Sequence, residues 1–271
     1  MKPVAFDYEK PRDISAAIKL LAQGNGGAKI IAGGQSLGPM LNLRLAQPQL
    51  VIDVRGIPEL CGVGDSDGSI VLGSCTTHAA IEDGTVPDIT RGLMREVAAN
   101  IAYRAVRNRG TIGGSLCHAD PAADWVSVLV LLSAVALVEG PAGRREIQAE
   151  RFMTGAFATE LADDEILVGI RIPKISSLGR WGHYKFCRKP GEFAEAISAV
   201  LVDPERGVCR AVMGATHGAP HVIEDAGFLA DGFDTEQAFA AVQRAGMADD
   251  PYERQIHHTA LKRAAMRLSA T

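Results

Sequence analysis

Apolar residues follow a helical spacing near the start of the chain and shorter, strand-like runs after it. Ile14, Ile18 and Leu21 recur every three or four positions behind Asp13, which predicts a helix over residues 13–23 with Asp13 as its N-cap. Apolar runs that follow predict strands at residues 28–31, 50–54 and 69–73. The first part of the chain is therefore expected to mix helices with short strands.

The middle of the chain contains its most apolar run, residues 125–138. These 14 residues are fewer than the ~20 that a membrane-spanning helix needs, so they predict a buried helix that runs into a strand. Before this run, a short helix capped by Thr77 is expected to end at Glu82, and a longer one is expected over residues 87–101. Further strands are predicted at residues 146–148 and 165–172.

A break in this pattern follows Pro173, where residues 176–179 are small and polar. It predicts one domain over residues 1–175 and a second over residues 176–271. Beyond the break, strands are predicted at residues 181–187, 194–202 and 207–215, and helices at residues 221–230, 235–245 and 252–269. Strands followed by helices predict an α+β fold for this part.

Composition and charge narrow the classes of function. The chain has 271 residues, with 28 Lys+Arg against 32 Asp+Glu, and its formal net charge of -4 argues against nucleic acid as the main partner. Its 47% hydrophobic residues are typical of a globular chain rather than a disordered one. Glycine is in excess, 29 residues where an average of ~7% would give fewer, which suggests loops that a ligand approaches closely.

The cysteines lack the spacing of a metal or cluster motif. No two of the five lie in CxxC spacing, so the chain is expected to hold neither a zinc ribbon nor an iron–sulfur cluster of its own. Their odd number, with no signal peptide at the N-terminus, indicates reduced thiols in the cytoplasm. They are Cys61, Cys75, Cys117, Cys187 and Cys209.

The most informative feature is a pair of similar segments, residues 30–37 (IIAGGQSL) and residues 109–116 (RGTIGGSL), called here the first and second glycine segments. Each places Gly-Gly after apolar residues and before a polar residue and Leu. Glycine lets the backbone turn sharply and present successive N–H groups to an anion. One such segment alone is better explained as a turn, but two with matching chemistry favour a clamp for a diphosphate. Walker A and GxGxxG sequences are both missing.

The surroundings of these segments resemble one family. Pro39-Met40 and residues 42–44 (NLR) follow the first segment, and residues 118–121 (HADP) follow the second. With these neighbours, the chain resembles the FAD-binding medium subunit of molybdenum hydroxylases, of the carbon monoxide dehydrogenase and xanthine dehydrogenase type. The resemblance covers nearly the whole chain, including the opening residues 3–11, the strand residues 166–173, and residues 185–189 (KFCRK).

The resemblance implies an α+β fold with a bilobal FAD-binding domain of the vanillyl-alcohol-oxidase-like (PCMH) type. Its lobes would span residues 1–55 and 56–175, and a C-terminal domain of three antiparallel strands and three helices would follow. The implied cofactor-binding residues are Ile31, Ala32, Gly33, Gly34, Gln35, Ser36, Leu37, Ile101, Thr111, Ile112, Gly113, Gly114, Ser115, Asp124, Leu167, Lys185 and Phe193. Phe193 stands where some relatives have Tyr, and Gln35 where several have His.

The same resemblance implies a relay of electrons rather than catalysis by side chains. A molybdenum centre in a large subunit would oxidise the substrate, and electrons would pass through 2Fe-2S clusters in a small subunit to FAD in this chain. From FAD they would go to NAD, a quinone, oxygen or another acceptor, with a dimer of heterotrimers as the expected assembly. No catalytic side chain and no metal ligand is expected here. The alternatives are a stand-alone FAD-dependent oxidoreductase of the same fold and a non-catalytic nucleotide-binding assembly protein.

Several individual residues allow a plainer interpretation. The adjacent Cys117 and His118 are metal-ligand types, but neighbouring side chains usually diverge, so a metal site is disfavoured. Asp124 suits the N-cap or first turn of the helix that follows it. Lys185 suits either a solvated strand end or a cation beside the flavin. Two further groups are left with surface or partner roles: Arg104, Arg107 and Arg109, which could alternatively approach phosphate, and His257-His258, expected on the surface.

Overall fold

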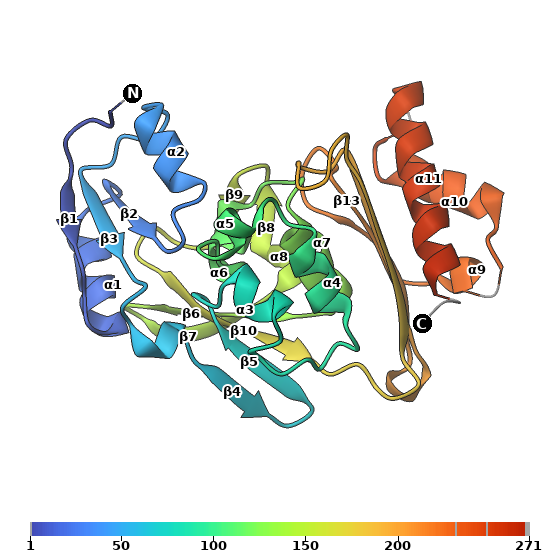
Figure 1. Cartoon of the computed structure of the whole chain (residues 1–271), viewed down its shortest axis with the longest axis horizontal. Helices are drawn as coiled ribbons and strands as arrows, with labels where there is room; N and C mark the ends of the chain where they lie inside the picture. Colours follow the sequence, from blue (N-terminus) through green and yellow to red (C-terminus); the bar gives the residue numbers. More distant parts are fainter. Residues whose placement is uncertain (1, 231, 248, 269–271) are drawn as a thin grey trace.

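The computed structural model describes residues 2–230, 232–247 and 249–268, and its sheets lie side by side along the longest axis of the molecule (Figure 1). The N-terminal lobe is a three-stranded parallel sheet in the order β1-β3-β2. Asp13 accepts a hydrogen bond from the backbone N–H of Ala16 at 2.7 Å, as its predicted role as N-cap requires. The elements of this lobe are β1 (Asp7–Glu9), α1 (Ile14–Gln23), β2 (Ala28–Ile31), α2 (Leu37–Asn42) and β3 (Leu50–Asp53).

The second lobe is a five-stranded antiparallel sheet in the order β4-β5-β10-β6-β7, preceded in the chain by a short 3-10 helix, Pro58–Leu60. Its strands are β4 (Val63–Ser66), β5 (Ser69–Gly73), β6 (Val135–Gly140), β7 (Gly143–Gln148) and β10 (Ile166–Pro173), and β8 (Met153–Gly155) and β9 (Ala158–Thr159) form a separate two-stranded sheet. Its helices are α3 (His78–Glu82), α4 (Leu93–Ala99), α5 (Arg104–Arg107), α6 (Ile112–His118), α7 (Asp124–Leu131) and α8 (Ala149–Phe152).

The apolar run predicted as a buried helix and a strand forms α7 and β6. Every residue of α7 is buried, because the helix lies between the sheet of the second lobe and the sheet of the C-terminal part (Figure 1). The main hydrophobic core therefore extends from α7 to Leu201 and Val212 of the C-terminal sheet. A single core crosses the predicted boundary at residues 175–176, and the division into two domains stays a prediction.

The C-terminal part is a four-stranded antiparallel sheet, covered by helices on the face away from α7 (Figure 1). The α+β class is confirmed, with one strand more than expected, because residues 221–223 form an edge strand instead of the start of a helix. Two β-branched residues, Val222 and Ile223, favour pairing with the neighbouring strand over helix. The strands are β11 (Arg180–Phe186), β12 (Ala196–Asp203), β13 (Val208–Gly214) and β14 (His221–Ile223), with a 3-10 turn at Pro204–Arg206; the helices are α9 (Gly227–Ala230), α10 (Thr235–Arg244) and α11 (Pro251–Arg267).

Other predictions are wrong in detail. The helix expected from residue 87 begins only at Leu93, because the Asp88 carboxylate accepts from the backbone N–H of Thr90 and Gly92 and holds a turn there. His257 and His258 are buried rather than on the surface, and the ring of His258 stacks on Phe239 with centroids 4.0 Å apart. The predicted end of the last helix at residue 269 lies outside the described residues.

Candidate functional site

The two glycine segments, more than seventy residues apart in sequence, contact each other. A Cβ added to Gly33 would lie 2.2 Å from the backbone oxygen of Arg109 and 2.7 Å from the Cα of Gly110. No side chain fits there, so the close approach of the two backbones requires glycine at position 33. A Cβ on Gly114 would be 3.8 Å from the Cβ of Ala32. The segments therefore form one continuous wall between the two lobes.

The first glycine segment exposes backbone donors. Gly34 has a left-handed φ of +72°, which turns the chain from β2 into α2. The side-chain amide of Gln35 donates to the carbonyl oxygen of Gly33 at 3.0 Å and stabilises the turn. Within the described part of the chain, the backbone N–H groups of residues 33–36 donate to no protein acceptor. Successive free N–H groups in a turn are an anion-binding arrangement.

The second glycine segment is the start of a helix, not an open loop as the sequence pattern suggested. Thr111 caps α6 and its hydroxyl oxygen accepts from the N–H of Gly114 at 3.0 Å. Neither Gly113 nor Gly114 has a positive φ. Gly113 is required by packing, because a Cβ there would be 2.6 Å from the backbone oxygen of Ser74. The Ser115 side chain is half-buried, and its hydroxyl makes no hydrogen bond to another described residue.

Residues 74–78 hold the second glycine segment in place. The N–H of Ile112 donates to Thr76 O at 2.9 Å, that of Gly113 to Ser74 O at 3.0 Å, and that of His78 to Gly110 O at 2.9 Å. His78 itself accepts a hydrogen bond from Trp125 Nε1 at 3.0 Å. Burial, together with the positive charge of Arg107, lowers the pKa of His78 to about 4, so the ring is neutral at pH 7. Sequence patterns gave no sign of this support.

A cavity of about 250 Å³ opens beside the glycine wall, between β2 of the first lobe and β10 of the second. Of the predicted cofactor residues, those that line it are Ala32, Gly113, Gly114 and Leu167. Lining residues that the sequence did not suggest include Lys29, Ser74, Cys117, Thr159 and Asp163. Burial raises the pKa of the Cys117 thiol to about 12, so this part of the wall carries no thiolate at neutral pH. These residues belong to no sequence motif, so only the three-dimensional contact of the two lobes shows that they line the cavity.

A second group of predicted residues meets where α7 approaches β11. Lys185 Nζ lies 2.9 Å from Asp124 Oδ2, and their side chains are only 8% and 6% exposed. Lys185 also donates to the backbone oxygen of Asn100 at 3.3 Å, next to the predicted residue Ile101. Asp124 lies in the first turn of α7, whose N-cap is Ala123. The plainer interpretation of Lys185 as a solvated strand end is therefore wrong.

One carboxylate oxygen of the buried Asp124–Lys185 pair lacks a hydrogen-bond donor among the described residues. Asp124 Oδ1 is buried and has no hydrogen-bond partner among the described residues. A buried carboxylate oxygen without a partner is costly, so a ligand donor is a physically reasonable partner for it.

Phe193 stands apart, 64% exposed in the connection between β11 and β12. That connection still packs near Ile101, because a Cβ on Gly191 would be 2.8 Å from the backbone oxygen of Ala102.

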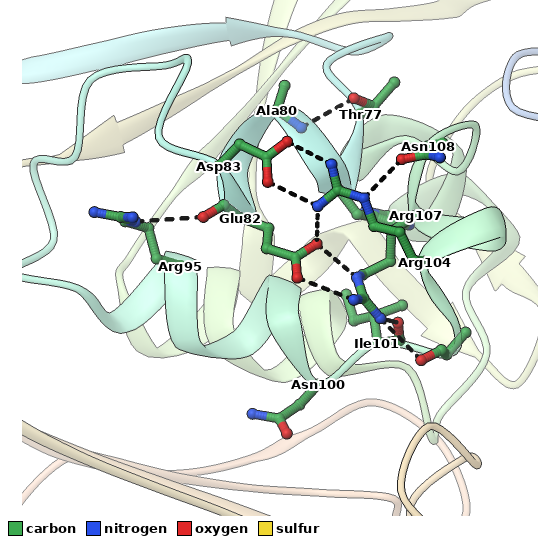
Figure 2. A network of polar contacts seen from close by, with 12 residues as sticks. Thr77, Ala80, Glu82, Asp83, Arg95, Asn100, Ile101, Arg104, Arg107 and Asn108 are labelled. Atoms are coloured by element: carbon green, nitrogen blue, oxygen red, sulfur yellow. Dashed lines mark hydrogen bonds and ion pairs between the residues drawn. The ribbon is translucent and has the colours of Figure 1, made fainter.

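None of Arg104, Arg107 and Arg109 is among the residues that line the cavity. Arg104 and Arg107 of α5 pair with Glu82 and Asp83 at the end of α3 (Figure 2), which argues against the alternative that they bind phosphate. That this arginine cluster faces a partner subunit stays a prediction. The hydrogen bond from Arg107 holds the pKa of Glu82 below its usual range. Arg109 is exposed.

Among the described residues, no three His, Cys, Asp or Glu side chains gather closely enough to hold a metal ion. Nor does any helix in residues 2–230, 232–247 and 249–268 have the length and apolar character needed to cross a membrane.

Two lobes that meet over paired glycine segments beside a cavity, followed by a smaller α+β part, form an arrangement suited to a nucleotide cofactor. Residues 4–175 match the family described as the FAD binding domain in molybdopterin dehydrogenase, and the chain belongs to this family. The resemblance found in the sequence is confirmed, and so is FAD as the cofactor. The free N–H groups of the first segment and the cavity beside it suit a ligand with phosphates.

Relatives of known activity cover almost the entire chain. The carbon monoxide dehydrogenase medium chain of Hydrogenophaga pseudoflava is 34% identical over 93% of this chain and 90% of its own length. Subunit alpha of the 6-hydroxypseudooxynicotine dehydrogenase complex of Paenarthrobacter nicotinovorans is 35% identical over 97% of this chain and 91% of its own. A solved carbon monoxide dehydrogenase from Hydrogenophaga pseudoflava, lacking the Mo-pyranopterin moiety of its molybdenum cofactor, superposes with a TM-score of 0.90, 33% identity, and coverage of 100% and 99%. The chain is thus an oxidoreductase subunit of the FAD-binding medium type.

Proposed function

We propose that this chain receives electrons from iron–sulfur clusters of a small partner subunit and passes them to an external acceptor, while a large partner subunit holds the molybdenum cofactor. FAD, when bound, supplies the relay between one-electron donors and an acceptor such as NAD or a quinone. The observation that carries the proposal is the direct contact of the two glycine segments at Gly33 and Arg109, beside the cavity between the lobes.

The two segments would share the diphosphate unequally. The free backbone N–H groups of residues 33–36 supply donors, and the hydroxyl of Ser115 makes no hydrogen bond to any other described residue. In the second segment, the N–H groups of Ile112, Gly113 and Gly114 are already used within the chain. We therefore assign phosphate binding chiefly to the first segment, and shape and closure of the site to the second. Thr111 acts mainly through its cap.

The flavin end of the site would lie at the buried pair of Asp124 and Lys185. Because Asp124 neutralises most of the Lys185 charge, Lys185 acts there as a positioned hydrogen-bond donor more than as a net positive charge. Asp124 Oδ1 remains able to accept from a ligand hydroxyl. Ile101, Leu167 and Phe193 would supply apolar contacts, and Phe193, lacking a hydroxyl, offers no hydrogen bond.

The assembly is part of the proposal. The relatives are a medium chain and a subunit of a dehydrogenase complex, which supports a heterotrimer, and we propose that two heterotrimers associate. We also propose a cytoplasmic location, where thiols such as those of the five cysteines are kept reduced.

Purification of the chain with co-expressed neighbouring gene products tests the proposal. The expected complex is yellow, releases FAD on acid treatment, and contains two further chains by mass spectrometry. Release of FMN, or no flavin at all, would refute the assigned site. A fully active monomer would replace the subunit assignment with a stand-alone flavoenzyme, and a colourless protein that binds another nucleotide would indicate an assembly role.

A further inference from the structure

The turn formed by Asn100, Ile101 and Ala102 is held from three sides. Lys185 donates to the backbone oxygen of Asn100 at 3.3 Å. Arg107 Nη1 donates to the backbone oxygens of both Ile101 and Ala102, each at 3.0 Å. The β11–β12 connection presses against Ala102 at Gly191. Ala102 has a left-handed φ of +43°, which a non-glycine residue adopts only when its surroundings enforce it.

Each of the three side-chain nitrogens of Arg107 donates a hydrogen bond. Its Nε and Nη2 donate to the two carboxylate oxygens of Glu82 at 2.7 and 2.9 Å, which leaves Nη1 for the two backbone oxygens (Figure 2). Its side chain is only 12% exposed. A guanidinium held in this two-pronged way has one orientation, so it can set the position of a backbone turn, which a flexible lysine cannot do equally well.

We propose that Arg107 is a positioning residue for the flavin end of the site, acting through the turn at residues 100–102. This inference rests on the proposed function, which places Ile101, Asp124 and Lys185 beside the flavin. Glu82 orients Arg107, Arg107 orients the turn, and the turn sets both Ile101 and the oxygen that Lys185 contacts. Arg107 touches neither the cavity nor Lys185, so it acts only through the backbone.

The same helix offers a matched control. Arg104 lies one turn earlier in α5 and pairs with Glu82 and Asp83, but its side chain is 47% exposed. Unlike Arg107, it donates to no backbone oxygen of residues 100–102 within the described part of the chain. Arg104→Lys therefore loses comparable ion pairing at α3 without loosening the turn.

The test compares FAD binding by the full-length chain and by its Arg107→Lys and Arg104→Lys variants. Titration of apoprotein with FAD gives the Kd, visible circular dichroism of the bound flavin reports its surroundings, and a melting curve reports stability. We expect Arg107→Lys to raise the Kd about tenfold, with a changed flavin dichroism, and Arg104→Lys to stay within about twofold of the parent.

A purely structural role gives a different result. A lower melting temperature for Arg107→Lys, with the Kd and flavin dichroism of the folded protein unchanged, would overturn the proposal. If Arg107→Lys does not fold, Glu82→Gln decides, because it leaves the Arg107 side chain present but poorly oriented, with Asp83→Asn as its control. We then expect a Kd about threefold higher for Glu82→Gln than for Asp83→Asn, and equal values would overturn the inference. A parent chain that binds no FAD would refute the proposed function instead.

Discussion

In the first glycine segment Gly34 has a φ of +72°, whereas in the second neither Gly113 nor Gly114 leaves the ordinary helical region. Among the described residues, the backbone N–H groups of residues 33–36 in the first segment donate to no acceptor, whereas those of Ile112, Gly113 and Gly114 in the second donate to Thr76, Ser74 and Thr111. Two segments with a similar sequence pattern therefore need glycine for different reasons. One needs it for conformation and close approach, the other for packing against residue 74.

The largest effect is expected where a Cβ would meet backbone. Gly33→Ala places a methyl group 2.2 Å from Arg109 O, and Gly113→Ala places one 2.6 Å from Ser74 O. Neither oxygen can move without breaking the wall, so each variant should lose about 3 kcal/mol of unfolding free energy or more, together with bound FAD. Urea unfolding and the flavin-to-protein absorbance ratio measure the two effects.

Gly38→Ala is the control for this prediction. Gly38 lies in α2, has no positive φ, and a Cβ there meets nothing within 4 Å. Alanine favours helix over glycine, so this variant should be neutral or more stable by up to about 1 kcal/mol. If Gly33→Ala is as stable as Gly38→Ala, the two segments do not touch as described.

These glycines also show which features of the structure the sequence could predict. Local pattern predicted that the two glycine segments act together, the α+β class, and the run from α7 into β6, because spacing and glycine placement are local properties. The helical start of the second segment did not follow, since a close contact with Ser74 and a glycine turn look alike in sequence. The ion pairs of Arg104 and Arg107 and the burial of His257 depend on residues distant in the chain, so no local pattern announces them.

Acid should loosen the second glycine segment through His78. The folded pKa of about 4 is below the 6.5 of an unfolded histidine, so between these values the unfolded chain binds the extra proton. The contribution is complete above pH 6.5 and is lost as the pH falls towards 4, by about 1.4 kcal/mol for each pH unit. Urea unfolding of the parent and of His78→Asn from pH 7 to 4 measures this contribution.

The difference between the two proteins isolates His78 from other groups that titrate in the same range, such as His257, whose pKa burial also lowers to about 4. His78→Asn should be less stable at pH 7, because Trp125 Nε1 loses its imidazole acceptor and Gly110 loses packing against the ring, but it should show a shallower fall in stability with acid. Parallel curves would mean that His78 titrates normally and does not link the second segment to pH.

A smaller effect is expected for the conformation of the first segment. Gly34→Ala forces a side chain into a left-handed φ, which costs about 1–2 kcal/mol, and its Cβ meets only the flexible end of Ile31 at 3.1 Å. Asn tolerates this region better, so Gly34→Asn should recover part of the loss. Urea unfolding ranks the variants, and equal losses for Ala and Asn would point to crowding instead of backbone conformation.

The smallest effect concerns the cap of α6 and is best measured as a coupling. Thr111→Ala removes the hydroxyl that accepts from Gly114 N–H and should cost about 1 kcal/mol, whereas Thr111→Ser keeps it and should cost less. Gly114→Ala places its Cβ 2.8 Å from the same hydroxyl oxygen, so it should disturb the same cap. In the double variant the clash is gone. Its loss of unfolding free energy should therefore be smaller than the sum of the two single losses, by at least about 0.5 kcal/mol in a double-mutant cycle of urea unfolding. Strict additivity would show that Gly114 is needed for the cavity surface rather than for the cap, and would make the second segment more like the first.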